Sequence, residues 1–525
     1  MADALLENLE RTRPEHRREC RWHRLLVDSY TGGGGYESKC APMPEVGYWG
    51  PAASIYAATA SAFAGDGETN TYLDRHPRED SAKFAKRLEV ANYLNYVEPL
   101  TDLKVSYLLR KPVTRQGEAK PVTAWREDID GTGTTWDDLR PSIVTAAAIV
   151  GWVPVLFDRP AFPGSMSKAQ AAELGLDRWI IQQLAPSNLL EWKVEGGVVQ
   201  WVKIRTCYTD RERWDSTPEE VEVYTIWTPT DATRFEVRNV DGKEKAVTSY
   251  APVPHNFGRV PLAIFRHKRV PMAVDPNCFG GLPMHGAIAR VARRLFNLTS
   301  EFDEHIRSQV FAVLVLAMRG SPQQGEINIG AENGLILDPE SSQQHYYLAP
   351  PPSVAETLDK RTLSTVQEIY RIARVEFARA TVSVASSGVA RAYDFAQTNQ
   401  AIADFGAEIA RGEQDAAYLI ARGDGLSHEQ AVKQRVIPAS EYGIDDLAGD
   451  MKLAADAVTM KLGPTATVEV KVRAIDALLP QLDAAKRKAI RAELEKQENE
   501  PPPAPPPLPG PKPPAPTPPP APPPA

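Results

Sequence analysis

The chain is poor in the residues that mark several large classes of protein. It has 4 cysteines among 525 residues, at positions 20, 40, 207 and 278, and these are too few and too scattered for a disulfide framework. The longest apolar run, Val310 to Met318, has nine residues, about half of the length that a membrane-spanning helix needs. The N-terminus is charged throughout and lacks the apolar core of a secretory signal. We therefore expect a soluble protein of a reducing compartment, with no membrane segment.

Concentrated positive charge is also missing. The 60 Lys and Arg residues face 68 Asp and Glu residues, which gives a formal net charge of −8. This balance argues against a tight, non-specific grip on nucleic acid, although it allows a protein that lets DNA pass. A hydrophobic content of 42% excludes wholesale disorder, and the length predicts three or four compact units.

The C-terminus has the clearest change in composition. Of the 46 prolines, 17 lie in residues 501–525, and such a segment cannot form a hydrogen-bonded ladder. We expect a disordered tail there, preceded by a charged helix that ends where the prolines begin. At the other end, the pattern predicts one charged helix to about Tyr30, ended by the glycine run Gly32–Gly35, which we interpret as a flexible linker.

The sequence patterns between the N-terminal glycine run and the proline-rich tail predict an α+β protein. A helix is expected from Glu79 to about Leu109, with a kink at Pro99. Residues 121–270 then contain a helix, a buried strand from Trp152 to Phe157, and several runs rich in β-branched and aromatic residues. These runs are separated by turn residues and predict an antiparallel sheet of about five or six strands, closed by one more strand before residue 270.

Long helices follow this sheet. Apolar residues from Met284 to Ile306 recur at spacings of three and four, which predicts a helix about 33 Å long at ~1.5 Å per residue. A small β-rich insert with Gly and Pro turns comes next, and then a helix from about Val354 to Phe377. A break at Ser386–Gly388 precedes a third long helix, from Phe395 to Ile420.

Sequence motifs for catalysis are mostly absent. The residues after Gly32–Gly35 break the order of a phosphate-binding loop, and no His-Glu-x-x-His or Gly-x-Ser-x-Gly occurs. Ser165 and Lys168 fit Ser-x-x-Lys, but the companion motifs are missing, so we interpret the segment as a capped loop and helix.

Metal-binding patterns are weak as well. Cys20 and His23 have ligand-like spacing and Cys40 lies farther on, but a second close pair is missing, so isolated thiols and a surface histidine are favoured. Asp128 and Asp130 are interpreted as turn residues. Asp137 and Asp138 follow Thr135, where carboxylates favour a helix N-terminus. We therefore predict no catalytic, cofactor-binding or metal-binding residues, and a structural or assembly protein rather than an enzyme.

The order of these elements resembles the portal proteins of tailed bacteriophages. Four stretches carry the resemblance: YLDRHPREDSAKFAKRLEVANYLNYVEPLTDLKVSYLLRKPV, DIDGTGTTWDDLRPSIVTAAAIVGWVPVLFDRP, APSNLLEW with PHNFGRVPLAIFRHKR, and SSGVARAYDFAQTNQAIADFGAEIARGEQ. Together they span roughly residues 50–425.

The resemblance implies a portal-type fold. It divides the chain into an N-terminal arm (1–48), a β-rich wing (49–270), a first stem helix (271–318), a clip (319–352), a second stem helix (353–379), a tunnel loop with a long wing helix (380–425), a helical crown (426–500) and a disordered Pro-rich tail (501–525). The break around Ala380–Tyr393 would fall near the tunnel loop.

The resemblance also implies a role and partners. Portal proteins form a ring, usually of twelve subunits, at one vertex of the capsid, and double-stranded DNA enters and leaves through its axial tunnel. The implied partners are further copies of the chain, the terminase large subunit, the head–tail adaptor, and the major capsid and scaffolding proteins. The implied location is the virion, with assembly in the host cytoplasm.

Some alternatives stay open at this point. Arg290, Arg293, Arg294 and Arg307 either face the tunnel or pair with acidic residues of the next subunit. The chain could also be another phage head or connector protein. A cytosolic hydrolase or nuclease would instead use the carboxylates of Asp128–Asp138, or Ser165 with Lys168.

Overall fold

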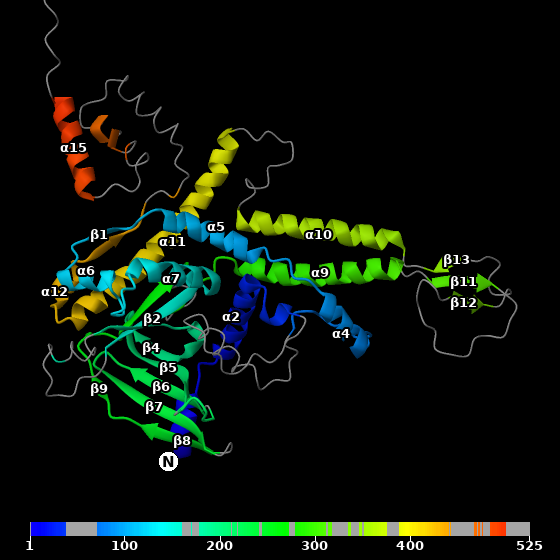
Figure 1. Ribbon diagram of the computed structural model, residues 1–525, viewed down its shortest axis with the longest axis horizontal. Helices are drawn as coiled ribbons and strands as arrows, with labels where there is room; N and C mark the ends of the chain where they lie inside the picture. Colours follow the sequence, from blue (N-terminus) through cyan, green and yellow to red (C-terminus); the bar gives the residue numbers. More distant parts are fainter. Residues whose placement is uncertain are drawn as a thin grey trace, which may run out of the picture. The chain divides into compact units, whose positions relative to one another are not determined.

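The computed structural model describes residues 2–37, 71–159, 170, 178–211, 213–217, 219–240, 244–271, 279–310, 313–317, 334–337, 346–348, 351–374, 388–439, 442, 467–469, 471–472, 475 and 484–499 (Figure 1). The chain divides into two compact units, Met1–Tyr442 and Gly443–Ala525. Helices and antiparallel strands are both abundant, so the predicted α+β class is confirmed. The second unit contains helix α15 (Ala484–Asn499), which is the charged helix expected before the prolines, while the expected disordered tail at 501–525 lies outside the described residues.

The N-terminal arm contains two helices instead of the one that was predicted. Helix α1 (Ala2–Glu10) and helix α2 (His16–Thr31) are separated by a short connection that contains Pro14. Helix α2 ends at Gly32, which has a φ of 72° and donates its N–H to the Asp28 carbonyl. Such a left-handed residue after a helix is usually glycine, because glycine has no Cβ to clash.

The interpretation of Gly32–Gly35 as a flexible linker is wrong. The run forms a short 3-10 turn, η1 (Gly34–Tyr36), which folds back over the buried carboxylate of Asp28. The Gly35 N–H donates to Asp28 Oδ2 at 3.1 Å, and the Tyr72 hydroxyl donates to the same oxygen at 2.8 Å. A side chain at Gly34 would collide with this carboxylate, so glycine is needed there for close packing.

The helix predicted from Glu79 to Leu109 is two helices, and Pro99 does not kink it. Helix α4 (Ser81–Val90) is followed by extended backbone, and helix α5 (Val97–Arg110) starts after it. Asn95 begins the second helix by accepting hydrogen bonds from the N–H groups of Val97 and Glu98, both at 3.1 Å. Pro99 lies in the first turn, where a helix needs no N–H from it.

The central core is built on a small sheet with the order β10-β2-β3. Strands β2 (Trp152–Asp158), β3 (Ile180–Gln183) and β10 (Leu262–Arg266) pair antiparallel. Helices α6 (Lys120–Glu127), α7 (Trp136–Val150) and α11 (Gly388–Gly423) surround this sheet. Large side chains from the sheet, from α7 and from α11 meet there and are almost fully buried: Trp136, Ile143, Phe157, Phe265 and Phe405.

A second, larger sheet carries most of the predicted strands. Its antiparallel order is β4-β5-β6-β7-β8, from β4 (Leu189–Glu195), β5 (Val198–Asp210), β6 (Glu219–Trp227), β7 (Asp231–Val240) and β8 (Glu244–Ser249), with β9 (Val253–Pro254) paired to β7. The 3-10 turn η2 (Pro186–Asn188) leads into β4. The predicted antiparallel sheet of five or six strands is confirmed, but its first expected strand, β3, and the closing strand β10 pair with β2 in the smaller sheet instead.

The next segment is a helical hairpin with a strand insert at its end (Figure 1). Helix α9 (Gly286–Val310) and helix α10 (Pro352–Ala373) lie side by side. Between them, β11 (Val313–Ala317) pairs parallel with β12 (Gly334–Leu337) and antiparallel with β13 (Tyr346–Leu348). Helix α9 ends eight residues before the predicted limit of the first stem helix at 318, since the insert already begins with β11.

The third long helix also differs from its prediction at both ends. Helix α11 begins at Gly388, inside the expected break at Ala380–Tyr393; residues 375–387 lie outside the described residues. After it, helix α12 (His428–Val432) leads to β14 (Arg435–Ile437), which pairs with β1 (Thr114–Gln116). Residues 426–442 therefore belong to the first unit.

Candidate functional site

The helical hairpin is firmly packed at the end where α9 begins and α10 finishes. Here Ile288 and Leu295 of α9 meet Ile369 of α10, and all three side chains are at most 1% exposed. Val97 and Leu100 from α5 complete this cluster. The predicted apolar stripe of α9 is thus confirmed in this half of the helix, where it forms a core with the same chain.

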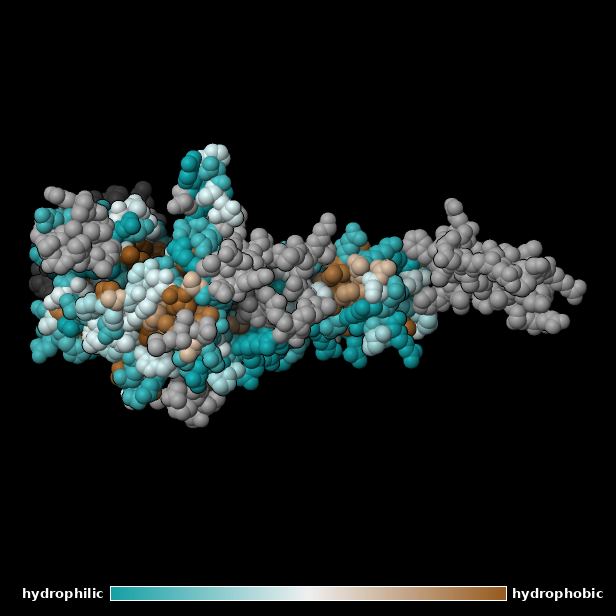
Figure 2. Space-filling model, turned by 90° about the horizontal axis from the view of Figure 1, so that it is seen from below, coloured by the Kyte–Doolittle hydropathy of each residue, from teal (hydrophilic) through white to brown (hydrophobic). Residues whose placement is uncertain are grey.

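The half of the hairpin next to the strand insert has no such core. Beyond Ser300, none of the described side chains of α9 is buried, and none of α10 is buried before Thr365. Figure 2 shows an apolar area on the face seen from below, in the part of the molecule that contains α4 and the hairpin. We call the exposed apolar side chains here the distal surface: Ile306 (37% exposed), Val310 (68%), Val354 (42%) and Leu363 (53%).

Two of the four arginines of α9 have partners within the chain. Arg293 donates to Asp74 at 2.9 Å, and Arg290 stacks 4.5 Å above the ring of Trp22. Among the described residues, Arg294 and Arg307 have no ion-pair partner. The α9 arginines therefore divide into two that contact Trp22 or Asp74 of the same chain and two without an ion-pair partner among the described residues.

The four candidate carboxylates have two structural roles: Asp128 and Asp130 form a turn, and Asp137 and Asp138 begin a helix. Asp128 closes a turn by accepting the N–H groups of Gly131 at 2.7 Å and Gly133 at 3.1 Å. Asp130 accepts from Thr132, and the Thr132 hydroxyl lowers the pKa of Asp130 to about 2. Both residues were predicted to be turn residues, and this prediction is confirmed.

The other two carboxylates start helix α7. Asp138 and Thr135 form a reciprocal capping box, and the Thr135 hydroxyl lowers the pKa of Asp138. Asp137 accepts two hydrogen bonds from Arg115, at 2.6 and 3.2 Å, and these lower the pKa of Asp137. The predicted helix start is confirmed. Within the described residues, no group of three or more His, Cys, Asp or Glu side chains is arranged to hold a metal.

Cys20 and His23 lie on the buried face of α2. The prediction of a surface histidine is wrong, since His23 is only 6% exposed and burial lowers its pKa to about 4. Cys20 is 1% exposed and lies 3.6 Å from His16, and burial raises the pKa of its thiol to about 11. This thiol stays protonated and unreactive. Cys40, Ser165 and Lys168 lie outside the described residues.

A buried ionic network surrounds Glu413, and no sequence pattern indicated it. This residue of α11 is 1% exposed and accepts from Arg115 at 2.8 Å and Arg126 at 2.7 Å. Arg140 of α7 lies 3.5 Å from its other oxygen. The partners are nearly 300 positions away along the chain, so spacing could not reveal them. The network fixes α11 to β1, α6 and α7.

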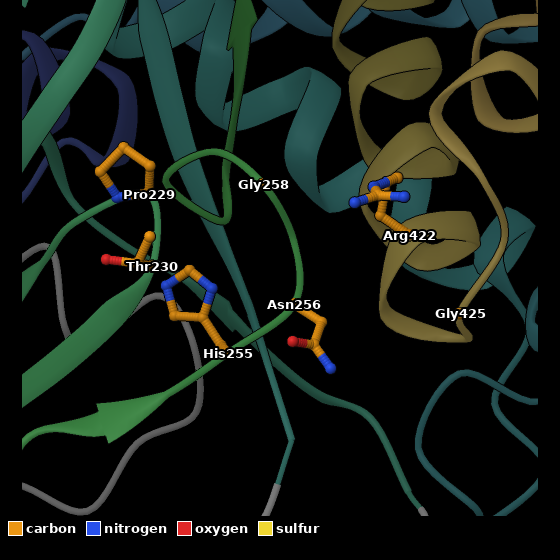
Figure 3. Close-up of a pocket in the computed structure, with 7 residues that line it drawn as sticks. All are labelled: Pro229, Thr230, His255, Asn256, Gly258, Arg422 and Gly425. Atoms are coloured by element: carbon orange, nitrogen blue, oxygen red, sulfur yellow. The ribbon is translucent and has the colours of Figure 1, made fainter.

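A cavity of about 420 Å³ lies between two loops near the larger sheet and the end of α11 (Figure 3). Its lining residues are Pro229, Thr230, His255, Asn256, Gly258, Arg422 and Gly425. His255 Nε2 bonds to the Thr228 carbonyl at 3.0 Å, and the Thr230 hydroxyl donates to Asp231 at 2.8 Å. Thr230 is therefore engaged by a carboxylate and is not paired with the imidazole as a nucleophile would be.

Comparison with known proteins finds similar solved structures but no family. No family model matches the sequence, and no curated protein matches it. A solved chain from "Neck of empty GTA particle computed with C6 symmetry" is similar at 11% sequence identity and a TM-score of 0.36, over 75% of this chain and 88% of that chain. A match at this level carries no argument about fold or function. In the described part of the chain, no helix is both long and apolar enough to span a membrane.

Proposed function

We propose that the chain is a portal protein of a tailed-phage-like particle, forming a ring at one vertex of the capsid. The observation that carries this proposal is the order of elements α9, β11–β13, α10 and α11. Two long helices joined by a small strand insert are what the resemblance implies for stem, clip and stem. The next long helix, α11, then packs back on the central core, as expected of a wing helix.

The distal surface supports assembly into a ring. The four large apolar side chains of the distal surface are exposed to solvent. The buried core of the hairpin lies at the opposite end, where α9 begins and α10 finishes. Mixed charges surround them, with Asp303 and Arg307 on α9 and Asp359 and Lys360 on α10. Contact between one face of this hairpin and a different face on the next copy is head-to-tail, and such contacts give a ring when the rotation from copy to copy closes on itself.

The charge of the chain suits a conduit. Each phosphate contact adds affinity that depends on salt and resists sliding, so a DNA channel needs few of them. A net charge of −8 fits that requirement. The strand insert at the end of the hairpin is the proposed docking platform for the terminase large subunit and later for the head–tail adaptor. Capsid and scaffolding proteins would contact the outside of the ring in the virion.

We also propose that the protein is not an enzyme. The candidate carboxylates Asp128, Asp130, Asp137 and Asp138 are all engaged in turns, a helix cap or an ion pair. Their substitution is therefore expected to change folding and no hydrolytic activity. Of the alternatives, another head or connector protein would also oligomerise, but it would lack the stem–clip–stem order.

Substitution on the distal surface tests the assembly step. Leu363→Asp places a charge on a side chain that is 53% exposed, so the fold should tolerate it within about 0.5 kcal/mol. If copies pack through this surface, the burial of that charge should abolish or strongly weaken the ring. Mass photometry measures the oligomer and thermal unfolding measures stability.

Thr123→Asp, on an exposed position of α6 outside the hairpin, is the matched control. It should leave both the oligomer and the stability unchanged. A Leu363→Asp protein that assembles as well as the Thr123→Asp protein would contradict the proposed interface.

A further inference from the structure

Trp214 stands at the tip of the hairpin formed by β5 and β6. Its side chain is 83% exposed, and no ring or cation stacks on it within the described residues. A tight turn holds it there, because the Ser216 hydroxyl donates to the Arg213 carbonyl at 2.8 Å and accepts from the Arg213 N–H at 3.1 Å. Arg211 also donates to the Ser216 carbonyl, at 3.0 Å. An ordered turn thus presents to solvent a residue type that is enriched in the energetic centres of protein interfaces.

The cavity of Figure 3 lies at the opposite end of the same sheet. Trp214 lies in the connection before β6, whereas Pro229 and Thr230 of the cavity lie in the connection after it. Strand β6 has nine residues, which separate the two connections by about 30 Å at ~3.3 Å per residue. Trp214 therefore cannot enter the cavity of its own chain.

Arg422 is the cation of this cavity, and no carboxylate neutralises it among the described residues. Its Nη1 donates to the Leu426 carbonyl at 2.8 Å, and its buried Nε has no hydrogen-bond partner. The nearby Arg259, in contrast, pairs with Asp415 at 3.2 Å. A half-buried guanidinium without a counter-charge is stabilised by the negative face of an aromatic ring.

Stacking of arginine on tryptophan already joins elements of this protein. The described residues include three such pairs: Arg13 3.5 Å above Trp192, Arg159 4.0 Å above Trp179, and Arg290 4.5 Å above Trp22. Trp214 and Arg422 have no such partner within the described chain. The cavity, at about 420 Å³, is within the range of about 300–1,000 Å³ that holds small ligands, so it can hold an indole ring.

His255 adds a requirement for a hydrogen-bond donor. Burial lowers the pKa of its imidazole, so the ring is neutral at pH 7. Its Nε2 donates to the Thr228 carbonyl at 3.0 Å, which leaves Nδ1 as an acceptor. This Nδ1 is buried and has no hydrogen-bond partner. An indole N–H is a donor only, so one tryptophan side chain offers both the ring face and the donor that the cavity lacks.

We propose that Trp214 of one copy of the chain enters this cavity on a second copy and stacks on Arg422 there, with its indole N–H directed to His255. The tip and the cavity are different surfaces at opposite ends of one sheet, so the contact is head-to-tail and each copy can both give and receive a tryptophan. This inference rests on the proposed ring and names a contact between its neighbouring subunits, in addition to the distal surface.

Substitutions on the two sides of the contact test it. Trp214→Ala and Arg422→Ala should each raise at least tenfold the protein concentration at which half of the copies are assembled, because each removes one half of a stacked pair. Trp214→Phe keeps an aromatic face and should fall between Trp214→Ala and the unaltered protein. Val90→Ala, at a position of α4 that is 44% exposed, is the control and should assemble normally. Mass photometry on dilution measures assembly, and thermal unfolding checks the fold.

A crosslink separates this contact from the ring itself. Trp214→Cys combined with Asn256→Cys, in a chain that also carries Cys207→Ser, should give a ladder of disulfide-linked copies on oxidation. Neither cysteine substitution alone should give the ladder. A ring without the ladder, in which Trp214→Ala and Arg422→Ala also assemble normally, would overturn the contact and leave the portal proposal standing. A ladder of open chains without a closed ring would support the contact and contradict the portal proposal, and the absence of both would contradict both.

Discussion

At the scale of single residues, the ionic network around Glu413 joins four separate elements of the described chain. One carboxylate at 1% exposure faces three guanidinium groups, and Asp137 and Glu118 complete the charge balance at Arg115 and Arg126. None of this could be predicted from the sequence, since an arginine and a glutamate that are far apart give no periodic signal. The turn and cap roles of Asp128 and Asp138 were predictable, because their partners lie within five positions.

Glu413→Gln should be strongly destabilising. The amide keeps the shape of the side chain but leaves Arg140 buried without a counter-charge and takes one of two carboxylate partners from Arg126. Loss of one partner from a buried ion pair typically costs about 3–5 kcal/mol. Urea unfolding of the purified protein measures the change. Glu429→Gln on an exposed position of α12 is the matched control and should fall within about 0.5 kcal/mol of the unaltered protein. Equal midpoints for the two variants would refute the importance of the network.

At the scale of helices and strands, the spacing of apolar residues predicted that a helix exists more reliably than it predicted where the helix begins and ends. The spacing from Met284 to Ile306 located α9, because its first half buries one continuous stripe. The same spacing could not tell that the stripe is exposed beyond Ser300. The helix from Glu79 to Leu109 was predicted as one because Pro99 was taken for a kink, whereas Asn95 starts a new helix. The pairing of β2 with β10 was hidden by more than 100 intervening residues.

The end of α10 allows a second stability prediction. Arg374 terminates the helix in the left-handed conformation, which costs an L-residue roughly 1–2 kcal/mol relative to glycine. Arg374→Gly should therefore raise the free energy of unfolding by about 1 kcal/mol. Thermal and urea unfolding measure it. Arg371→Gly, one turn earlier, should have the opposite sign, because glycine inside a helix is unfavourable. Destabilisation by Arg374→Gly would show that the side chain contributes more to folding than the strain costs.

At the scale of the whole molecule, the strand insert is separable from the hairpin core. The cluster formed by Ile288, Leu295 and Ile369 lies at the opposite end of α9 and α10 from β11–β13. Replacing residues 321–350 with a short Gly-Ser connection should therefore leave the fold and ring assembly in place. Terminase docking should fail, because the proposed platform is gone. Packaging assays with purified particles measure this step, and unchanged packaging would disprove the docking role.

The most direct test of the portal proposal is the mass and outline of the purified full-length protein. Mass photometry with electron-microscope images should show a closed ring with a central channel and a mass near twelve times 57.7 kDa. The Leu363→Asp protein should lose this ring while keeping its fold. A compact dimer, or the absence of any ring over a wide range of protein concentrations, would contradict the proposal.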